Sequence, residues 1–336
     1  MSLRSVFSTV VIVLASFTAP SVAEQTLGDL VASGGYDWII GRWAAATDEG
    51  QKAEFTFDWA LDKHAVLNSL QMGDFRYQGM IRLSPTDQEA VDEGADSRGG
   101  TWKGTWSPDG DGLVRKVEHM GADGQTRKGE ILFGKVDADT ITIAIYAVDS
   151  SGSRSSEPWN KLTYKRQQGK PAPVSAAAET AGRSTDYQKL GDVVSEGGYE
   201  WLMGKWVAGE GDRTYELEYK PILNTHAAQA DVKIGDFKYI GMIMYVASRQ
   251  EIVQIGVDNM GGTWKGTWEQ DGSDALNKIE YTKPDGATVK LQHVYVKVSN
   301  DELKVKQYNV GTDGARGSES RGDLTFKRPK PATQAK

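Results

Sequence analysis

Apolar and polar residues alternate in short stretches along most of the chain. Phe75, Tyr77 and Ile81, for example, fall on one parity and Arg76 on the other, which is the two-residue period of a strand with one buried face. Turn-forming residues separate the stretches at 73–74, 108–110, 122–124, 271–272 and 284–286. The pattern therefore predicts an all-β chain of short antiparallel strands.

The same pattern occurs twice. The octet Gly-Gly-Thr-Trp-Lys-Gly-Thr-Trp at 99–106 returns unchanged at 261–268, an offset of 162 residues. That period is too long for a solenoid, whose repeats span about 20–50 residues. Each copy holds about nine or ten candidate strands, and closing them into a barrel removes exposed sheet edges. We predict two tandem antiparallel up-and-down β-barrels, each preceded by a short helix, at 27–32 and 187–195.

Shifts in composition give the domain boundaries. Residues 1–23 combine an early arginine, an apolar stretch and a small-residue cleavage site, which predicts a signal peptide. Residues 24–166 are expected to form barrel 1 and residues 187–328 barrel 2. The segment 167–186 is rich in Ala, Pro, Gly and Ser and predicts a flexible linker. Residues 329–336 are expected to be a disordered tail.

Sequence and composition indicate where the protein resides and which kinds of partner it can bind. Cleavage after Ala23 predicts a periplasmic or secreted protein. No second apolar run follows, so no integral membrane segment is expected after cleavage. The chain has no cysteine, which excludes disulfides, thiol catalysis and cysteine-ligated metals. The net charge is −7 with mixed signs, which argues against binding of nucleic acid.

The alternation also assigns residues to the barrel interiors. Trp102 and Trp106 share a face, and Gly104 between them leaves room for two large rings. On a late strand, Ile145 of the first copy is replaced by Gln307 in the second. We therefore expect the two interiors to differ.

Each copy begins with Gly-x-Trp after its helix and ends on a strand that closes with arginine: Gly41-Arg42-Trp43 with Arg166, and Gly204-Lys205-Trp206 with Arg328. This arrangement resembles the calycin superfamily, the lipocalins and their relatives. It is most similar to the uncharacterised lipocalin-like domains of secreted bacterial proteins, for which no activity is implied. The resemblance implies that each tryptophan closes one barrel end and that the arginine packs across its indole face, where a cation–π contact is favourable.

Barrels of this size enclose one ligand-sized cavity, so the inward residues predict a binding pocket. Histidines would be its polar anchors and aromatic rings its wall. The candidate pocket residues are His64, Phe75, Tyr77, Trp102 and Trp106 in the first copy, and His226, Phe237, Tyr239, Trp264 and Trp268 in the second.

The equivalent histidines His64 and His226 allow several interpretations. Parity with Ala228 and Ala230 predicts that His226 faces the interior. The pair would then be ligand anchors, haem ligands or catalytic bases, or histidines hydrogen-bonded to turn backbone. His119 and His293 have no histidine counterpart in the other copy and are expected to be structural or exposed.

Several common enzyme motifs are missing. The sequence has no Gly-x-Ser-x-Gly elbow, His-Glu-x-x-His motif or phosphate-binding loop, and no catalytic or metal-binding residue is predicted. We therefore expect a non-enzymatic protein without a cofactor that binds a small, largely apolar ligand in one or both barrels. The alternatives are a structural or protein-binding pair of packed barrels, an enzyme using the paired histidines, and a haem-binding barrel of the nitrobindin type.

Overall fold

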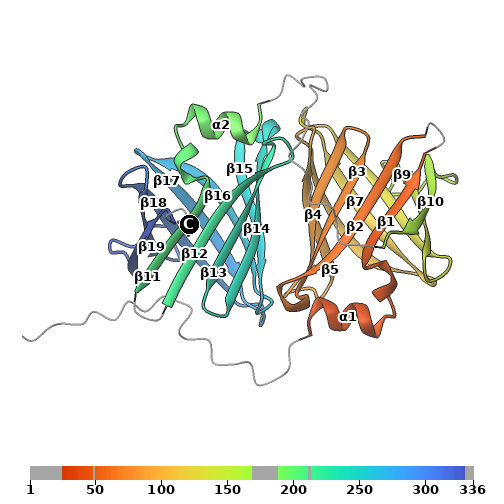
Figure 1. Ribbon diagram of the computed structural model, residues 1–336, viewed down its shortest axis with the longest axis horizontal. Helices are drawn as coiled ribbons and strands as arrows, with labels where there is room; N and C mark the ends of the chain where they lie inside the picture. Colours follow the sequence, from red (N-terminus) through yellow and green to blue (C-terminus); the bar gives the residue numbers. More distant parts are fainter. Residues whose placement is uncertain (1–24, 48–49, 169–187, 211–212, 330–336) are drawn as a thin grey trace, which may run out of the picture.

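The structure is a computed structural model that describes residues 25–47, 50–168, 188–210 and 213–329. It contains two closed antiparallel barrels of ten strands each, in which strands that follow one another along the chain lie side by side (Figure 1). In each barrel the last strand also pairs with the first, so no sheet edge is left unpaired. The predicted all-β fold of two tandem barrels is confirmed.

Barrel 1 and barrel 2 have the same order of elements. Barrel 1 consists of α1 (Leu27–Ser33), β1 (Gly41–Ala46), β2 (Lys52–Ala60), β3 (Ala65–Met72), β4 (Phe75–Leu83), β5 (Ala90–Asp96), β6 (Thr101–Asp109), β7 (Gly112–Met120), β8 (Thr126–Lys135), β9 (Thr140–Val148) and β10 (Asn160–Arg166). Barrel 2 consists of α2 (Leu190–Glu196), β11 (Gly204–Glu210), β12 (Arg213–Ile222), β13 (Ala227–Ile234), β14 (Phe237–Val246), β15 (Glu251–Asp258), β16 (Thr263–Asp271), β17 (Asp274–Thr282), β18 (Thr288–Lys297), β19 (Glu302–Asn309) and β20 (Gly322–Lys327).

A tryptophan and an arginine close the helix end of each barrel. Trp43 is fully buried, and its Nε1 donates to the Ile39 carbonyl at 2.8 Å. The Arg166 guanidinium lies 4.1 Å from the Trp43 ring and donates to the carbonyls of Ile40 and Trp38, both at 2.8 Å. In barrel 2 the corresponding distance, from Arg328 to Trp206, is 3.6 Å. Each arginine therefore connects the last strand to the segment that leads from the helix into the first strand.

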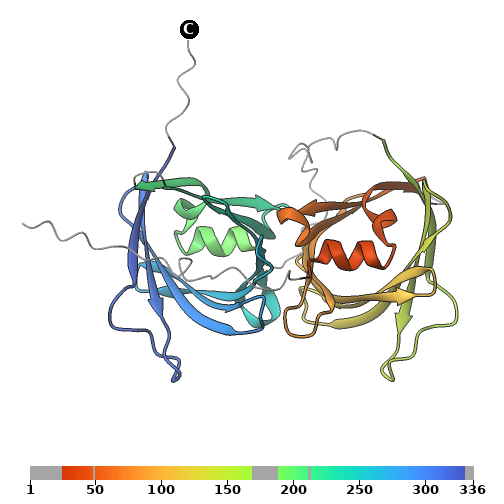
Figure 2. The same cartoon turned by 90° about the horizontal axis from the view of Figure 1, so that it is seen from below.

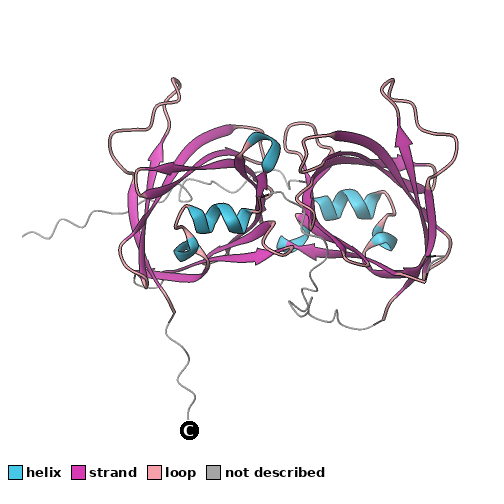
Figure 3. Cartoon of the chain, turned by 90° about the horizontal axis from the view of Figure 1, so that it is seen from above, coloured by secondary structure: helices cyan, strands magenta, loops and turns pink. Residues whose placement is uncertain are grey.

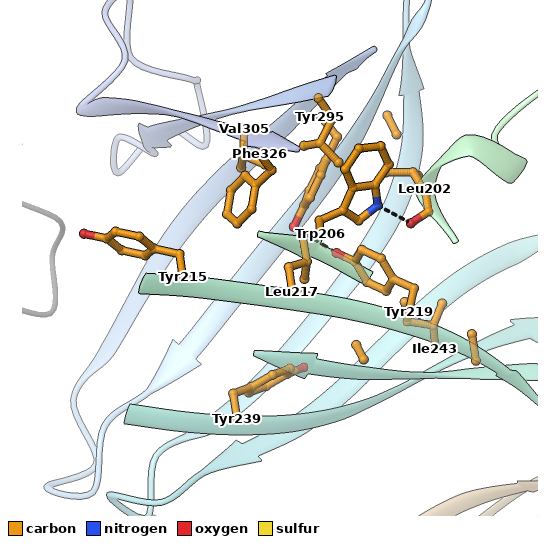
Figure 4. Packing of buried hydrophobic residues seen from close by; sticks show 14 of the residues in the cluster. Leu202, Trp206, Tyr215, Leu217, Tyr219, Tyr239, Ile243, Tyr295, Val305 and Phe326 are labelled. Atoms are coloured by element: carbon orange, nitrogen blue, oxygen red, sulfur yellow. Dashed lines mark hydrogen bonds between the residues drawn. The ribbon is translucent and has the colours of Figure 1, made fainter. Parts of the chain in front are cut away.

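Alternate residues of each strand fill the barrel interiors. In barrel 2 the inward side chains are largely aromatic, and Figure 4 shows Tyr219, Tyr239 and Tyr295 pointing into one shared space. In barrel 1, Phe57 and Phe133 stand where barrel 2 has Tyr219 and Tyr295, whereas Tyr239 is matched by Tyr77. The parity of the alternating stretches thus predicts the inward face of the strands, and the two interiors differ in polarity.

The two barrels pack side by side through the outer faces of β3–β5 and β13–β15 (Figures 1 and 2). Both sides of this contact are apolar. Ala95 of barrel 1 packs against Leu223, Ala227, Met242, Met244 and Ile255, and Val257 of barrel 2 packs against Leu61, Ala65 and Met80.

The contact between the barrels is nearly two-fold symmetric. Arg76 donates to Asn224, and at the equivalent place Lys238 lies 3.5 Å from Asp62. Residues 76 and 238, and residues 62 and 224, are related by the repeat offset. The helices α1 and α2 consequently cover opposite ends of the molecule, as Figure 1 shows, and each lies within the ring of its own strands in Figure 3. The pair has the geometry of an isologous dimer within one chain.

The signal peptide predicted at 1–23 lies outside the described residues. The same holds for most of the predicted linker, 167–186, and for most of the predicted tail, 329–336.

Candidate functional site

Each barrel holds a cavity beneath its helix. The cavity has a volume of about 280 Å³ in barrel 1 and about 450 Å³ in barrel 2. Equivalent positions line the two, and most are apolar: Leu27, Leu30, Val31, Ile39, Phe57, Ile81 and Trp106 in barrel 1, and Leu190, Val193, Val194, Leu202, Tyr219, Ile243 and Trp268 in barrel 2. Both barrels therefore have the same helix-covered apolar pocket.

Local sequence holds the helix of barrel 1 in this position. The Thr26 hydroxyl accepts from the Asp29 N–H at 3.1 Å, and the Asp29 carboxylate accepts from the Thr26 N–H at 2.9 Å. This capping box satisfies two N–H groups that the first turn leaves free. A Cβ atom at Gly28 would lie 2.7 Å from the Cβ of Lys63, so glycine is required where the helix meets the turn before β3. These residues hold the apolar side of the helix over the cavity.

Four buried polar residues meet deeper in barrel 1. Arg115 donates to the Asp92 carboxylate from Nε at 3.2 Å and from Nη2 at 2.5 Å. Its Nη2 also donates to the Tyr77 hydroxyl at 2.8 Å, and Asn68 donates to Asp92 at 3.0 Å. Asp92 is 0% exposed and Arg115 3%. A salt bridge this deep requires both partners, because either charge alone would be uncompensated.

The electrostatics of this cluster oppose acid–base chemistry. Burial raises the pKa of the Tyr77 hydroxyl far above its usual value, although the nearby Arg115 lowers it in part. Burial lowers the pKa of Arg115, but the Asp92 carboxylate and the hydrogen bonds outweigh burial, and the pKa is raised. Both groups therefore keep their protons near neutral pH.

Barrel 2 replaces the charged pair with two amides. Gln254 stands where barrel 1 has Asp92, and Asn277 stands where it has Arg115. Gln254 donates to the Tyr239 hydroxyl at 2.7 Å and accepts from Asn277 at 3.0 Å and from the Trp268 indole at 2.7 Å. Both charges are therefore absent from the equivalent level of barrel 2.

A further cavity of about 160 Å³ lies in barrel 2 next to these amides. Ala230 and Asn277 line it, and the residues at these positions in barrel 1 are the larger Asn68 and Arg115. The smaller side chains leave space that the polar cluster occupies in barrel 1. Its wall also includes Tyr219, Phe237, Tyr239, Trp264, Tyr281, Lys283, His293, Tyr295 and Gln307.

Aromatic rings separate this cavity from the pocket under α2. Tyr219 lines both, and its hydroxyl donates to that of Tyr295 at 3.1 Å (Figure 4). The Trp268 ring lies 5.1 Å from the Tyr295 ring. Burial raises the pKa of Tyr295 to about 12, so its hydroxyl stays protonated near neutral pH. Barrel 2 thus has two compartments divided by a neutral aromatic layer.

At the barrel end opposite the helix, a buried aspartate holds the tryptophan of each repeat. Asp96 accepts from the Trp102 indole at 2.8 Å and lies 3.1 Å from His119 Nε2, and the His119 ring stacks on Trp102 at 4.2 Å. In barrel 2, Tyr281 replaces the histidine and packs on Trp264 at 4.3 Å. His119 and Tyr281 therefore share a structural position despite their different chemistry.

The two equivalent carboxyl groups, Asp96 and Asp258, have pKa values shifted in opposite directions. Burial alone would raise the pKa of Asp96, but hydrogen bonds from His119, Trp102 and two backbone N–H groups hold it below its usual value. At the equivalent Asp258, burial prevails and the pKa is raised.

The structure places His64 and His226 at the contact between the barrels. A Cβ atom at Gly261 of barrel 2 would lie 3.3 Å from His64 Nδ1, and one at Gly99 of barrel 1 would lie 3.4 Å from His226 Nδ1. The expectation that His226 faces the interior is wrong, because the residue precedes β13 in a turn and strand parity does not apply there. Burial lowers the pKa of both histidines.

The other predicted pocket residues occupy different compartments. Trp106 and Trp268 line the helix-covered pockets, and Phe237, Tyr239 and Trp264 line the 160 Å³ cavity. Tyr77 and Trp102 belong to the polar and aspartate clusters of barrel 1. Phe75 is half-buried, with the Arg98 guanidinium 5.3 Å from its ring.

Sequence analysis missed Asp92, Arg115 and His293 as interior residues. Strand alternation predicts that His293 faces inward, because it lies two residues from both Leu291 and Tyr295 on β18. Its partner across the strand pair is Gln307, the polar residue that replaces Ile145 of the first copy. Asp92 and Arg115 fall on inward positions too, but charged residues on their own predict a solvated face.

No cluster of three or more potential metal ligands occurs within the described ranges. The helices of the described part are all too short or too polar to cross a membrane.

We compared the chain with protein families, curated proteins and solved structures. No family model and no curated protein matches the chain. A solved structure from Nostoc punctiforme PCC 73102, described as a protein with unknown function from the DUF3598 family, is 12% identical, with 86% of this chain and 94% of that chain covered and a TM-score of 0.20. At that score the match gives no information on fold or function.

Proposed function

We propose that this protein binds small, largely apolar molecules in the helix-covered pockets of its two barrels and acts without catalysis outside the cytoplasm. The observation that carries the proposal is the repetition of one apolar pocket at equivalent positions, with volumes of about 280 and 450 Å³. Ligand pockets enclose space of this order and have mostly apolar walls with few polar groups. The periplasmic or secreted location rests on the signal predicted at 1–23.

The short helices over the pockets depend on the barrels beneath them for their stability. α1 and α2 are seven residues long, and an isolated helix of that length is not stable in water. Their apolar sides therefore depend on the barrel beneath them, and a ligand would add apolar contact on the same side. Calycin-like resemblance agrees with a binding role, and the chain's Trp–Arg closure lies at this same end.

A fluorescent apolar probe tests the proposal directly. Titration of the full chain with 1-aminoanthracene, followed by energy transfer from Trp106 and Trp268, should saturate at two sites. Val31→Trp should fill the pocket of barrel 1 and Val194→Trp that of barrel 2, and each should remove one site. Ala32→Trp, at an exposed position of α1, is the matched control and should bind normally.

Native mass spectrometry of protein purified without detergent provides the second measurement. Extra mass that leaves on denaturation would support binding and give its stoichiometry. A bare polypeptide that also fails to bind the probe would overturn the proposal and favour a structural pair of packed barrels.

A further inference from the structure

His293 and Gln307 form a polar pair inside barrel 2. They are direct partners across β18 and β19, and both line the 160 Å³ cavity. In barrel 1 the same register positions are Ile131 and Ile145. Two apolar residues of one interior are thus replaced together by two hydrogen-bonding residues of the other.

Within the described residues, neither side chain has a hydrogen-bond partner. Burial lowers the pKa of His293 to about 4, so its imidazole is neutral near pH 7 and offers one donor and one acceptor. The Gln307 amide offers both as well. In the same wall, Asn277 Oδ1 is buried without a hydrogen-bond partner, which is unfavourable. The polar side of the cavity therefore suits a bound molecule that can donate and accept hydrogen bonds.

The remaining wall defines the shape and charge of that molecule. The rings of Tyr239 and Trp264 lie 5.6 Å apart, and those of Trp264 and Tyr281 lie 4.3 Å apart. The amides Gln254 and Asn277 replace the charged pair of barrel 1, and Lys283 follows β17 at the barrel end. A cavity of about 150 Å³ is known to hold benzene, so the volume here fits one ring.

We propose that the cavity of barrel 2 binds an uncharged, single-ring aromatic molecule whose carboxamide or hydroxyl group bonds to His293 and Gln307. The ring would pack against Tyr239, Trp264 and Tyr281. A carboxylate is disfavoured, because the charged residues of the wall, Glu216 and Lys283, have opposite signs and leave no net positive charge to balance a buried anion. This site is separate from the pocket under α2, and it does not depend on the function proposed for that pocket.

Titration calorimetry of the full chain with benzamide, phenol, benzoate and benzene tests the site. Benzamide and phenol should bind one equivalent, and benzoate should bind at least about tenfold more weakly. His293→Ile combined with Gln307→Ile installs the pair found in barrel 1. It should weaken benzamide at least about tenfold and leave benzene unchanged or tighter.

Two controls separate this site from other effects. His119→Tyr, which gives barrel 1 the barrel 2 residue, should leave benzamide binding unchanged. Val194→Trp blocks the pocket under α2 and should also leave it unchanged, so the two proposals can fail independently. Equal affinity for benzamide in the Ile/Ile variant, or equal affinity for benzamide and benzoate, would overturn the inference.

Discussion

At the residue scale, His293 shows how one substitution changes the chemistry of a barrel. Its position in barrel 1 is occupied by Ile131, which is buried among apolar side chains. The imidazole is kept neutral by burial, with a pKa of about 4. It therefore adds a hydrogen-bonding group to the interior without adding a charge.

This histidine makes stability depend on pH. Between about pH 6.5 and 4 the unfolded chain binds a proton at residue 293 and the folded chain does not, so the free energy of unfolding falls as pH falls through this window. The loss is on the order of 3 kcal/mol, and it ends below the folded pKa. His293→Ile should remove it. Urea midpoints measured from pH 7.5 to 4 would show this, and parallel curves for the two proteins would contradict it.

At the element scale, the polar cluster of barrel 1 ties separate strands together. Asn68, Tyr77, Asp92 and Arg115 come from β3, β4, β5 and β7, and all four are buried. Their hydrogen bonds cross the interior between strands that the sheet ladder joins only through neighbours. In barrel 2, Gln254 of β15 is linked to Tyr239 of β14 and to Asn277 of β17. The β13 residue at the position of Asn68 is Ala230, which has no polar side chain to join them.

The cluster predicts strongly coupled mutations. Arg115→Ala leaves the Asp92 carboxylate buried without a cation and should lower the free energy of unfolding by about 3–5 kcal/mol. The double variant Asp92→Gln with Arg115→Asn copies barrel 2 and should be less destabilised than the single variant, because no charge is left unpaired. A double-mutant cycle in urea measures the coupling, and additive losses would contradict it.

Strand parity explains how much of this could be predicted. It predicts the barrels and the inward face of each strand, because apolar and polar residues must alternate in a half-buried strand. It also places the replacement of Ile145 by Gln307 on an inward face. It fails at His64 and His226, which lie in turns. Parity also does not reveal that Asp92 and Arg115 form an ion pair. Their contact joins β5 to β7 across the barrel interior, and the alternation within one strand does not show which residue of another strand it faces.

At the scale of the whole molecule, the barrel contact depends on apolar outer faces. Met242 and Met244 alternate with Gly241, Ile243 and Tyr245, so β14 is apolar on both faces. A strand buried on both sides has such a continuous apolar run. The sequence of β14 carries this signal. The apolar residues of the facing surface are spread over the turn before β3 and over β3, β4 and β5, so they form no continuous run: Leu61, Ala65, Met80 and Ala95.

One charge in this contact should separate the barrels. Met242→Glu places a carboxylate where the side chain is 6% exposed, and its desolvation opposes docking. The radius of gyration from small-angle scattering should rise while circular dichroism stays that of folded barrels. Lys265→Glu, at an exposed position on β16, is the control and should scatter like the parent. An unchanged radius in Met242→Glu would show that the contact tolerates the charge.

The near two-fold relation has a consequence for how the two halves can differ. In a dimer of identical chains, every substitution appears on both sides of the axis, so a change that empties one barrel empties the other. Joining the copies in one chain removes that restriction. Barrel 1 can keep Asp92 and Arg115 as internal support while barrel 2 replaces them and holds open space. Covalent fusion thus lets one half keep a buried ion pair while the other keeps open space at the same level.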